Sequence, residues 1–374
     1  MDVETKISLV QQSPTEEVVT LDELRTLFET KTSPKHYIGL EISGKLHLGS
    51  LILTGFKIND FIKAGITTNV FLADWHTYIN NKLNNDWNLI TDISKYYEKA
   101  FKFFCPGVNV IFGSNLYDTT DNYWKNFVLF SKQITLARTL RSLTIMGRTE
   151  KDRLDFSQLL YPSMQSVDIK ALDLDIVHAG TDQRKIHMLV REVFPKLGWK
   201  VPISVHHHLL PGLAEPKTNN DTSTSFESID MKLKNDPSDT SSSNFHISEK
   251  NSDDSKIFNK MSKSNPSSSI LIHDSEQEIF QKISKAFCPI GISRDNPILE
   301  IVEHIIFHQY SDFIIERPSK YGGKVSYISY AEIKKDYEQN KIHPKDLKVA
   351  TAKYLNEIIS PVRDYLYNSI PEYL

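Results

Sequence analysis

The chain has 374 residues, of which 40% are hydrophobic and 24% are charged, and its formal net charge is −3. These values are ordinary for a soluble globular protein with room for two domains, and they exclude a uniformly basic surface of the kind that coats nucleic acid. No apolar run approaches the roughly 18 to 20 residues that a membrane-spanning helix needs, and the segment MDVETKISLVQQ lacks the apolar core of a secretory signal. We therefore expect a cytoplasmic protein without a membrane contact.

The cysteines and histidines form no clear disulfide or metal motif. Cys105 and Cys288 lie far apart and make no CxxC pair, so neither a disulfide framework nor a zinc knuckle is predicted. His206 and His208 would face the same side of a strand, but two histidines without a nearby third ligand make a poor metal site. We expect no metal bound by the protein itself.

The first half of the chain alternates between strand-like and helix-like segments. Residues 37–42 and 70–73 have the apolar character of buried strands, and residues 51–64 between them have a helical pattern that Gly65 ends. A second helix is expected to open at Gln183 and Arg184, because apolar residues recur at helical spacing directly after them. Strands that alternate with helices predict parallel βαβ units, and such units build a doubly wound α/β sheet.

Composition divides the rest of the chain. Residues 215–256 are rich in Asn, Asp, Ser, Thr and Lys and follow no helix or strand period, so we expect a flexible insertion there. Apolar residues recur at steps of three and four from Leu347 to Tyr365, which predicts an amphipathic helix. The predicted organisation is an N-terminal extension (1–35), a sheet domain (36–270) and a smaller, mainly α-helical domain (271–374).

Two separated segments carry residues suited to a nucleotide. After the first predicted strand, Gly39, Gly44 and Gly49 would let the backbone approach a phosphate or a flat ring, and His47 precedes a helix N-terminus, which favours anions. The spacing is not that of a P-loop, and glycines in a strand-to-helix turn are also common without a ligand. Far downstream, residues 259–269 (NKMSKSNPSSS) hold two lysines in a segment with almost nothing to bury, which a polyanionic ligand would explain.

The pairing of HLGS with KMSKS resembles the two signatures of class I aminoacyl-tRNA synthetases. Five further segments resemble, in the same order along the chain, the archaeal and eukaryotic type of tyrosyl-tRNA synthetase. The resemblance implies a Rossmann-like catalytic domain that carries the KMSKS loop at 260–264, a C-terminal anticodon-binding domain and a homodimer. The five segments are YIGLEISG (37–44), LADWHTY (72–78), YPSMQSVD (161–168), GTDQRKIH (180–187) and HPKDLK (343–348).

This resemblance implies an ATP-dependent tyrosine–tRNA ligase. The tyrosine carboxylate attacks the α-phosphate of ATP, which arrives with Mg²⁺, and the tyrosyl group then passes to the terminal ribose of tRNA(Tyr). The carboxylate is already ionised, so catalysis depends on positioning and on cations that face the phosphates, and no tightly bound cofactor is implied. The resemblance assigns catalysis to His47, Ser50, Lys260 and Lys263, and ATP binding to Gly39, His47, Gly49, Gly180, Asp182, Lys260, Met261, Ser262 and Lys263.

Two positions depart from the family pattern. Ser50 stands where the family usually has a histidine, and its hydroxyl is shorter and never cationic, although it can donate to a phosphate oxygen. Serine at position 50 therefore predicts either a lower activity or a compensating donor elsewhere. Ile42 replaces a usual proline, which should only soften the turn.

The segment YPSMQSVD supplies candidates for selecting the amino acid. Tyr161, Gln165 and Asp168 would share one face of a helix, with Pro162 tolerated in its first turn, and without the resemblance this face would as readily point to solvent. The resemblance pairs Tyr37 and Asp168 with the phenolic hydroxyl of the substrate. It assigns the whole tyrosine pocket to Tyr37, His76, Tyr161, Gln165, Asp168 and Gln183.

Candidate tRNA contacts come from both predicted domains. The resemblance places Arg141 and Arg184 at the first base pair of the acceptor stem, where planar guanidinium groups suit base edges and phosphates, although both could be ordinary surface arginines. It places Tyr321, His343 and Asp346 at an anticodon base. His343 followed by proline is also a typical helix start.

Two other functions remain open at this stage. A tryptophanyl-tRNA synthetase has the same fold and a similar loop, but its pocket should not need the pair Tyr37 and Asp168. A catalytically silent paralogue that binds RNA is suggested by Ser50 and the long insertion. The intact lysines of the KMSKS loop argue against the silent paralogue.

Overall fold

The computed structural model describes residues 1–149, 151–216, 261 and 266–369. Within this part of the chain, no helix is both long and apolar enough to cross a membrane. The predicted insertion at 215–256 falls outside the described residues except for its first two positions. Lys260, Ser262 and Lys263 of the predicted KMSKS loop also fall outside them, whereas Met261 is described.

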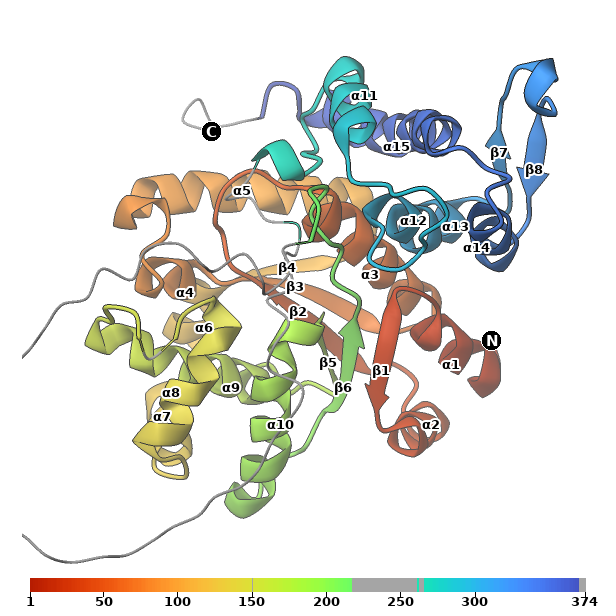
Figure 1. The fold of residues 1–374 in the computed structure, drawn as a ribbon. Helices are drawn as coiled ribbons and strands as arrows, with labels where there is room; N and C mark the ends of the chain where they lie inside the picture. The colour runs from red at the N-terminus through yellow and green to blue at the C-terminus, as the bar shows by residue number, and fades with distance from the viewer. Residues whose placement is uncertain (150, 217–260, 262–265, 370–374) are drawn as a thin grey trace, which may run out of the picture.

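A six-stranded sheet forms the centre of the larger part of the molecule (Figure 1). Five strands are parallel, which confirms the predicted Rossmann-like α/β architecture, and one edge strand runs antiparallel to its neighbour. That edge strand is β1, which lies in the predicted N-terminal extension. In sheet order the strands are β1 (Thr15–Val19), β6 (Ile203–His207), β5 (Ile176–Gly180), β2 (Lys35–Leu40), β3 (Thr67–Leu72) and β4 (Asn109–Phe112).

The strands lie close to the predicted segments, with shifts that have local causes. All five residues of β5 and of β6 are buried, as expected for parallel strands covered by helices on both faces. β2 ends at Leu40, two residues before the predicted end, because the backbone N–H of Ile42 turns away to donate to Thr77 Oγ1 at 2.7 Å. β3 begins at Thr67, where the register pairs its polar start with Lys35 of β2.

The helix after β2 begins earlier than predicted and ends where predicted. A π-helical turn, Leu48–Leu53, leads into α3 (Thr54–Lys63), and Gly65 beyond its end has φ +81°, the left-handed conformation that favours glycine. Helices α3 and α5 (Trp87–Phe104) cover one face of the sheet, and α9 (Tyr161–Ala171) and α10 (Arg184–Val193) lie on the other side (Figure 1). The remaining helices of this part are α1 (Val3–Gln11), α2 (Leu21–Thr30), α4 (Asp74–Ile79), α6 (Gly113–Thr119), α7 (Tyr123–Ser131) and α8 (Leu136–Ser142).

A buried lysine ties α1 to α3. The side chain of Lys57 is fully buried, and its ammonium group donates to the carbonyl oxygens of Leu9 (2.7 Å) and Gln12 (3.0 Å) and pairs with Asp60 at 3.1 Å. Burial lowers the pKa of Lys57 to about 8, against the opposing effect of the Asp60 carboxylate. His308 lies 3.0 Å from the same carboxylate, so the C-terminal helices also meet this buried cluster.

The C-terminal part is mainly helical, as predicted, with one short antiparallel strand pair, β7 (Phe313–Ile315) and β8 (Val325–Tyr327). The predicted amphipathic helix is α15 (Pro344–Leu366), whose stripe is buried from Leu347 to Val362. Tyr365 is the exception, since it is 46% exposed and stacks on Phe103 with 4.2 Å between ring centroids. The other helical segments are α11 (Glu276–Lys285), α12 (Pro297–Ile301), the π-helical Val302–Ile306, α13 (Phe307–Gln309) and α14 (Tyr330–Glu338).

Candidate functional site

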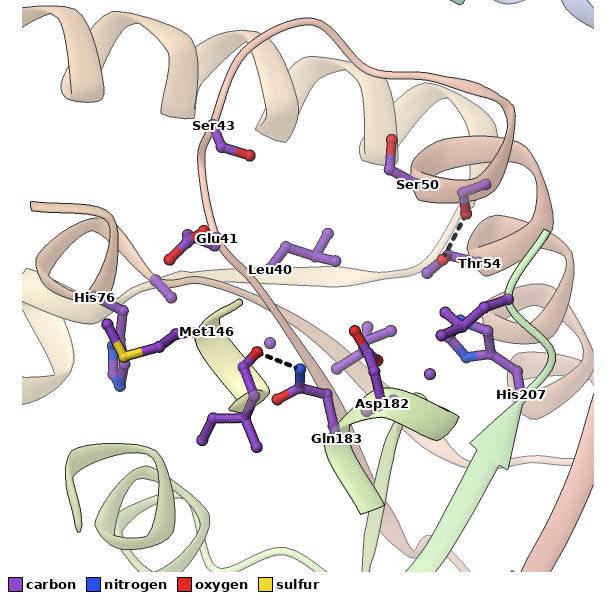
Figure 2. Close-up of a pocket in the computed structure, with 18 of the residues that line it drawn as sticks. Leu40, Glu41, Ser43, Ser50, Thr54, His76, Met146, Asp182, Gln183 and His207 are labelled. Atoms are coloured by element: carbon purple, nitrogen blue, oxygen red, sulfur yellow. Dashed lines mark hydrogen bonds between the residues drawn. The ribbon is translucent and has the colours of Figure 1, made fainter. Parts of the chain in front are cut away.

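A cavity of about 630 Å³ opens at the carboxyl ends of the parallel strands (Figure 2), where doubly wound sheets usually bind their ligands. Residues from β2, from the turn after it, from α9 and from the ends of β5 and β6 line it. The cavity brings together most of the residues predicted for tyrosine and ATP. These are Tyr37, Gly39, His47, Gly49, Ser50, His76, Tyr161, Gln165, Asp168, Gly180, Asp182, Gln183 and Met261.

The HLGS turn at one end of the cavity is held by its own side chains. His47 Nδ1 accepts hydrogen bonds from the backbone N–H groups of Gly49 (3.2 Å) and Ser50 (3.4 Å). The Ser50 hydroxyl accepts from the N–H of His47 at 2.9 Å and donates to the His47 carbonyl oxygen at 3.2 Å. The two residues thus form a reciprocal cap at the start of the π-helical turn, and the hydroxyl hydrogen of Ser50 is directed at the backbone.

The HLGS turn lies beside the chain that follows the KMSKS segment. The backbone N–H of Leu48 donates to the carbonyl of Ile270 at 2.8 Å, and that of Ile272 donates to Leu46 at 3.0 Å. Met261 is 5% exposed, lines the cavity and donates its N–H to the carbonyl of Leu210 at 2.7 Å. The chain on either side of residues 262–265 is therefore fixed to the same cavity as the HLGS turn.

Asp168 lies at the opposite end of the cavity and is 1% exposed. The hydroxyl of Tyr123 donates to its Oδ1 at 2.6 Å, and the hydroxyl of Tyr117 lies 3.5 Å from its Oδ2. His76 Nε2 is 3.6 Å from the same oxygen. Burial raises the pKa of Asp168 well above its usual value, and the two tyrosine hydroxyls only partly oppose this.

The aromatic residues around Asp168 stay neutral. Burial, together with the nearby charge of Asp168, raises the pKa of Tyr37, so its hydroxyl keeps its proton at neutral pH. Burial lowers the pKa of His76 to about 3, and its ring packs edge-on against Tyr161 with 4.5 Å between centroids. This end of the cavity is therefore a dry pocket with hydroxyl and carboxyl groups that can pair with a polar atom of a ligand.

The two glutamines predicted for the pocket form a short relay. Gln165 Nε2 donates to Gln183 Oε1 at 3.3 Å, and Gln183 Nε2 donates to the carbonyl of Ile145 at 2.7 Å (Figure 2). Gln165 Oε1 is buried and has no hydrogen-bond partner among the described residues. An unpaired buried acceptor costs free energy, which a ligand donor would recover.

Close packing explains the glycine at the end of β5. A Cβ on Gly180 would lie 2.5 Å from Leu209 Cδ2 and 2.9 Å from Asp182 Oδ1, so a larger residue would displace the cavity wall. The Asp182 side chain points into the cavity opposite His207 (Figure 2). The backbone of Gly180 and the carboxylate of Asp182 therefore both lie where they can contact a ligand closely.

The residues predicted to contact tRNA lie outside this cavity. Arg184 is the first residue of α10, is exposed, and pairs with Glu17 through two nitrogens, at 2.8 and 2.9 Å. Arg141 is exposed on α8. Among the cavity-lining residues, neither arginine is present.

The residues of the C-terminal part that are predicted to contact tRNA lie in the loop that carries Tyr321 and at the start of α15. Tyr321 is 60% exposed, and the Lys320 ammonium lies 4.8 Å from the centre of its ring. Arg317 joins this loop to the start of α15, because its side chain donates to the carbonyls of Gly323 (3.1 Å) and Lys341 (2.9 Å). His343 Nδ1 accepts from the N–H of Lys345 at 3.1 Å, which confirms its predicted place at a helix start, and Asp346 lies in the first turn.

Some residues of the site were not found from sequence. Tyr117 and Tyr123 contact Asp168 from α6 and α7, where they have the ordinary appearance of buried aromatic residues. Glu41 lines the cavity and accepts from Asn80 Nδ2 at 2.7 Å, and nothing in the YIGLEISG segment sets it apart from its neighbours. No spacing rule identifies such residues, because only the tertiary fold brings them to the cavity.

The histidine run at the end of β6 does not act as one unit. His206 contacts His187 and Glu17, whereas His208 contacts glutamates on two other segments, so the two histidines do not share a ligand. His207 Nδ1 lies 2.7 Å from His178 Nε2 inside the core. The expectation that His208 has no nearby ligand-type partner is therefore wrong, since Glu300 and His304 lie beside it.

Comparisons with known proteins agree with this geometry. The family model of class I tRNA synthetases (W and Y) matches residues 29–231 and 250–360. The chain is 44% identical to a tyrosine–tRNA ligase of Thermococcus sibiricus and 43% identical to one of Pyrococcus abyssi, in each case over 98% of this chain and 95% of the relative.

Solved structures show the same relationship. The crystal structure of tyrosyl-tRNA synthetase complexed with L-tyrosine from Pyrococcus horikoshii matches with a TM-score of 0.84 and 41% identity, over 98% of this chain and 97% of that one. A tryptophanyl-tRNA synthetase from Aeropyrum pernix shares only the fold, at 16% identity and a TM-score of 0.66 over 93% of this chain and 82% of that one. The chain therefore belongs to the class I tRNA synthetases for tryptophan and tyrosine, and within them to the archaeal type of tyrosyl-tRNA synthetase.

Proposed function

We propose that the chain is a tyrosine–tRNA ligase that activates tyrosine with ATP and transfers it to the terminal ribose of tRNA(Tyr). One observation carries the proposal: a single cavity has a buried carboxyl group among tyrosine hydroxyls at one end and the HLGS turn beside the flanks of the KMSKS loop at the other. The first end suits a phenol and the second suits phosphates. A tyrosine between them would direct its carboxylate toward the nucleotide.

Asp168 and Tyr37 select the amino acid by pairing with its phenolic hydroxyl. Both side chains are buried, so bound phenylalanine would leave them without a hydrogen-bond partner. Water cannot replace that partner in a buried pocket, and the missing hydrogen bonds cost free energy. Discrimination of about 10⁵ against phenylalanine is the established value for this enzyme family. Gln165 Oε1, the unpaired acceptor, binds the substrate ammonium group together with Gln183 and Tyr161. His76 packs edge-on against the ring of Tyr161.

ATP lies along the turn after β2 and the end of β5. Gly39, Gly49 and Gly180 admit it at close range, His47 faces the phosphates, and Asp182 accepts from the ribose. Mg²⁺ arrives with ATP and is held mainly by phosphate oxygens. The loop residues Met261, Ser262 and the two lysines complete this site.

Lys260 and Lys263 supply positive charge to the transferring phosphate. Met261, which lies between them in the sequence, lines the cavity. Because Ser50 uses its hydroxyl to cap the turn, we assign the stabilisation of phosphate charge to these lysines and to His47, and we give Ser50 the role of holding His47 in place.

Two separate surfaces bind tRNA(Tyr). Arg141 and Arg184 contact the acceptor stem beside the cavity, and Tyr321, His343 and Asp346 contact an anticodon base in the C-terminal part. Arg317 supports the second surface, because it joins the loop of Tyr321 to the start of α15. Since charged tRNA is consumed in translation, we place the chain in the cytoplasm.

The chain acts as a homodimer. Trp124, Val128 and Leu129 on α7 and Leu136 on α8 are all more than 40% exposed, an apolar group that a second copy would cover. Sedimentation of the wild-type chain should give the dimer mass, and Val128→Glu should shift it to the monomer. A wild-type chain that sediments as a monomer at micromolar concentration would refute this part of the proposal.

The deciding experiment is the amino-acid dependence of pyrophosphate exchange into ATP. We expect exchange with tyrosine and none above background with tryptophan or phenylalanine at equal concentration. Exchange that depends on tryptophan would identify a tryptophanyl enzyme instead. Binding of tRNA without adenylate formation at any magnesium concentration would identify a silent RNA-binding paralogue.

A further inference from the structure

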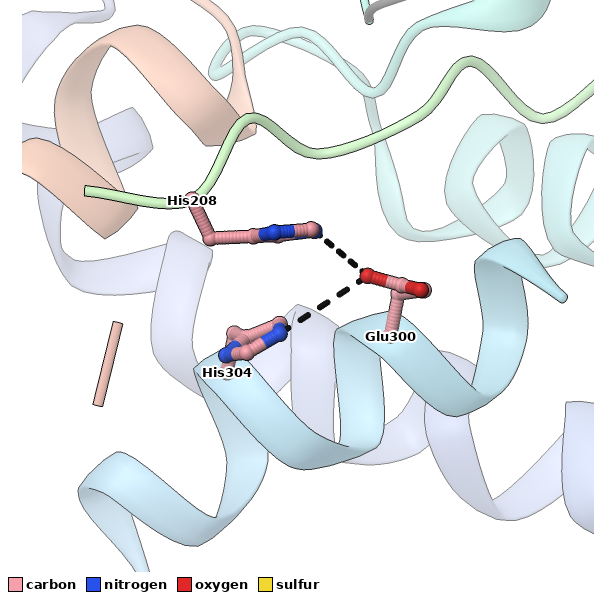
Figure 3. A group of neighbouring side chains, drawn as sticks. All are labelled: His208, Glu300 and His304. Carbon is pink, nitrogen blue, oxygen red and sulfur yellow. Dashed lines mark ion pairs between the residues drawn. The ribbon is translucent and has the colours of Figure 1, made fainter. Parts of the chain in front are cut away.

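Three side chains of the types that bind metal ions meet beside the catalytic cavity (Figure 3). They come from two distant parts of the chain. His208 follows β6, Glu300 lies on α12, and His304 lies in the π-helical segment one turn further on. One nitrogen or oxygen from each lies within 4.8 Å of the other two. The Glu300 oxygen is 2.5 Å from His208 Nε2 and 3.7 Å from His304 Nε2, so both imidazole rings point at the same carboxylate.

The remaining nitrogen of each ring is held from behind. His208 Nδ1 lies 2.5 Å from the carboxylate of Glu16, and His304 Nδ1 lies 2.8 Å from the hydroxyl of Ser13. The two rings stack with 4.3 Å between their centroids, which aligns their Nε2 atoms on one side. In metal sites, histidine ligands are oriented in this way, with the second ring nitrogen bound to a carboxylate or another polar group.

The atoms that face the centre of the cluster are poorly satisfied. His208 Nε2 and Glu300 Oε2 are buried, and although they are close, neither forms a hydrogen bond of normal geometry with any described residue. The three side chains as a whole keep between 14% and 24% of their exposure, so the cluster lies near the protein surface. Buried atoms that converge without good hydrogen bonds are expected where a further group belongs.

We propose that His208, Glu300 and His304 bind one divalent transition-metal ion, for which Zn²⁺ is the best match. Two imidazole nitrogens and one carboxylate oxygen suit zinc, with water as the fourth ligand, whereas Mg²⁺ and Ca²⁺ prefer oxygen ligands. The site differs from the magnesium that accompanies ATP, because its ligands lie at the junction between the sheet and the C-terminal helices.

Such an ion would join the C-terminal helices to the catalytic cavity. His208 itself lines the cavity, and Leu210, two residues further on, holds the N–H of Met261. Metal bound at His208 would therefore fix the segment to which one flank of the KMSKS loop is attached. We assign the ion a positioning role, since it would act through the segment that holds Met261.

The experiment is a metal titration of the full chain after removal of metals with a chelator. A proton competes with a metal ion for the imidazole nitrogens of the site, because only neutral imidazole binds a metal. The titration is therefore run at pH 8 with Co²⁺ and then Zn²⁺. We expect one equivalent of Co²⁺ with the visible absorption bands of a tetrahedral site, lost on addition of one equivalent of Zn²⁺.

Variants separate this site from other metal-binding residues. His304→Gln should abolish the Co²⁺ bands, and Glu16→Gln, which leaves all three ligands in place, should weaken binding about 10- to 100-fold. His273→Gln is the matched control, because His273 is a partly buried histidine bonded to Tyr96 outside the cluster, and its variant should bind as the wild type does.

Two results would overturn the proposal. The first is a wild-type chain with no stoichiometric Co²⁺ spectrum, which would leave the cluster as an ion-paired contact only. The second is unchanged binding in His304→Gln. If that variant does not fold, the wild-type spectrum and Glu16→Gln still decide, because neither depends on it. All readouts are of metal binding, so their outcome is independent of the amino-acid dependence of pyrophosphate exchange.

Discussion

The tyrosine end and the phosphate end of the cavity are built in different ways. At the tyrosine end the polar groups are almost completely buried side chains, mainly from helices, and Tyr117 and Tyr123 bond to Asp168. At the phosphate end the polar groups are largely backbone, capped by His47 and Ser50 and partly open to solvent. In the proposed function, selection thus depends on a fixed set of buried partners, whereas phosphate binding depends on the turn and on two lysines from a separate segment.

This difference follows from the chemistry of the two substrates. A phenol differs from a phenyl ring by a single hydroxyl. It is therefore recognised best in a pocket whose polar groups, if left unpaired by phenylalanine, cannot bind water instead. Phosphates carry full charges that many donors recognise, so backbone N–H groups and lysines suffice. Substitutions at the tyrosine end should therefore change which amino acid is used, and substitutions at the phosphate end should change rate or stability.

The largest effect is expected for Asp168→Asn at the tyrosine end. The amide cannot replace the carboxyl group in the network with Tyr123 and Tyr117, so kcat/KM for tyrosine should fall about 10³-fold while that for phenylalanine changes little. The measurement is pyrophosphate exchange with each amino acid. Asp173→Asn, a carboxylate exposed at the end of the same helix, is the control. Equal losses for both amino acids would show that Asp168 does not read the hydroxyl.

Three buried histidines, one at the tyrosine end and two elsewhere in the core, also predict acid sensitivity. Burial lowers the pKa of His36, His76 and His187 to about 3, below the value of about 6.5 expected in the unfolded chain. The stability contributed by their neutral form is complete above pH 6.5 and is lost as the pH falls toward 3. The free energy of unfolding should decrease by about 1 kcal/mol per pH unit for each histidine.

Urea unfolding at pH 7.5, 6.5 and 5.5 measures this dependence. His36→Leu should reduce the slope, because both nitrogens of His36 are buried without a hydrogen-bond partner among the described residues. His343→Leu, an exposed histidine at the start of α15, should leave the slope unchanged. A slope that is the same in His36→Leu as in the wild type would mean that His36 is protonated in the folded chain.

A smaller effect is expected for Gln165→Ala. Loss of the unpaired acceptor should raise KM for tyrosine about tenfold with little change in kcat, because the ammonium group is bound equally in the ground and transition states. Gln277→Ala, on the exposed surface of α11, is the matched control. A fall in kcat at constant KM would mean that Gln165 acts in the reaction itself. The tyrosine end would then affect rate as the phosphate end does, contrary to the proposed difference.

The smallest effect is expected at the phosphate end, for Ser50→Ala. The variant loses the reciprocal cap with His47 and should be destabilised by about 1 kcal/mol, with pyrophosphate exchange reduced only a few-fold. Ser329→Ala removes a comparable cap from α14 and should cost similar stability without affecting exchange. Exchange lowered 100-fold or more in Ser50→Ala would mean that its hydroxyl serves the phosphates directly.

The sequence predicted those features that have a period or a motif. Buried strands, the helix ended by Gly65 and the stripe of α15 follow from apolar spacing, and motif resemblance selected the cavity residues. The contribution of β1 was not predicted, because TEEVV lacks the continuous apolar character of an inner strand and pairs only at the sheet edge.

Contacts between distant segments could not be predicted. Tyr123 reaches Asp168, and Glu300 reaches His208, through the packing of elements that share no sequence signal. The capping role of the Ser50 hydroxyl was equally hidden, since a serine after HLG is compatible with either a cap or a phosphate contact. In each case the deciding quantity is a direction in space, which residue types and spacing do not encode.

The buried ammonium of Lys57 makes the first helix indispensable. Both of its carbonyl acceptors, Leu9 and Gln12, come from α1 or its end, while Asp60 is shared with His308. A chain shortened to begin after Gln12 would keep a cation in its interior with two of its three partners gone, at a cost of several kcal/mol. Start-site choice, or trimming by a protease, would thus weaken the buried contact between the sheet domain and the C-terminal helices without removing a residue of the cavity.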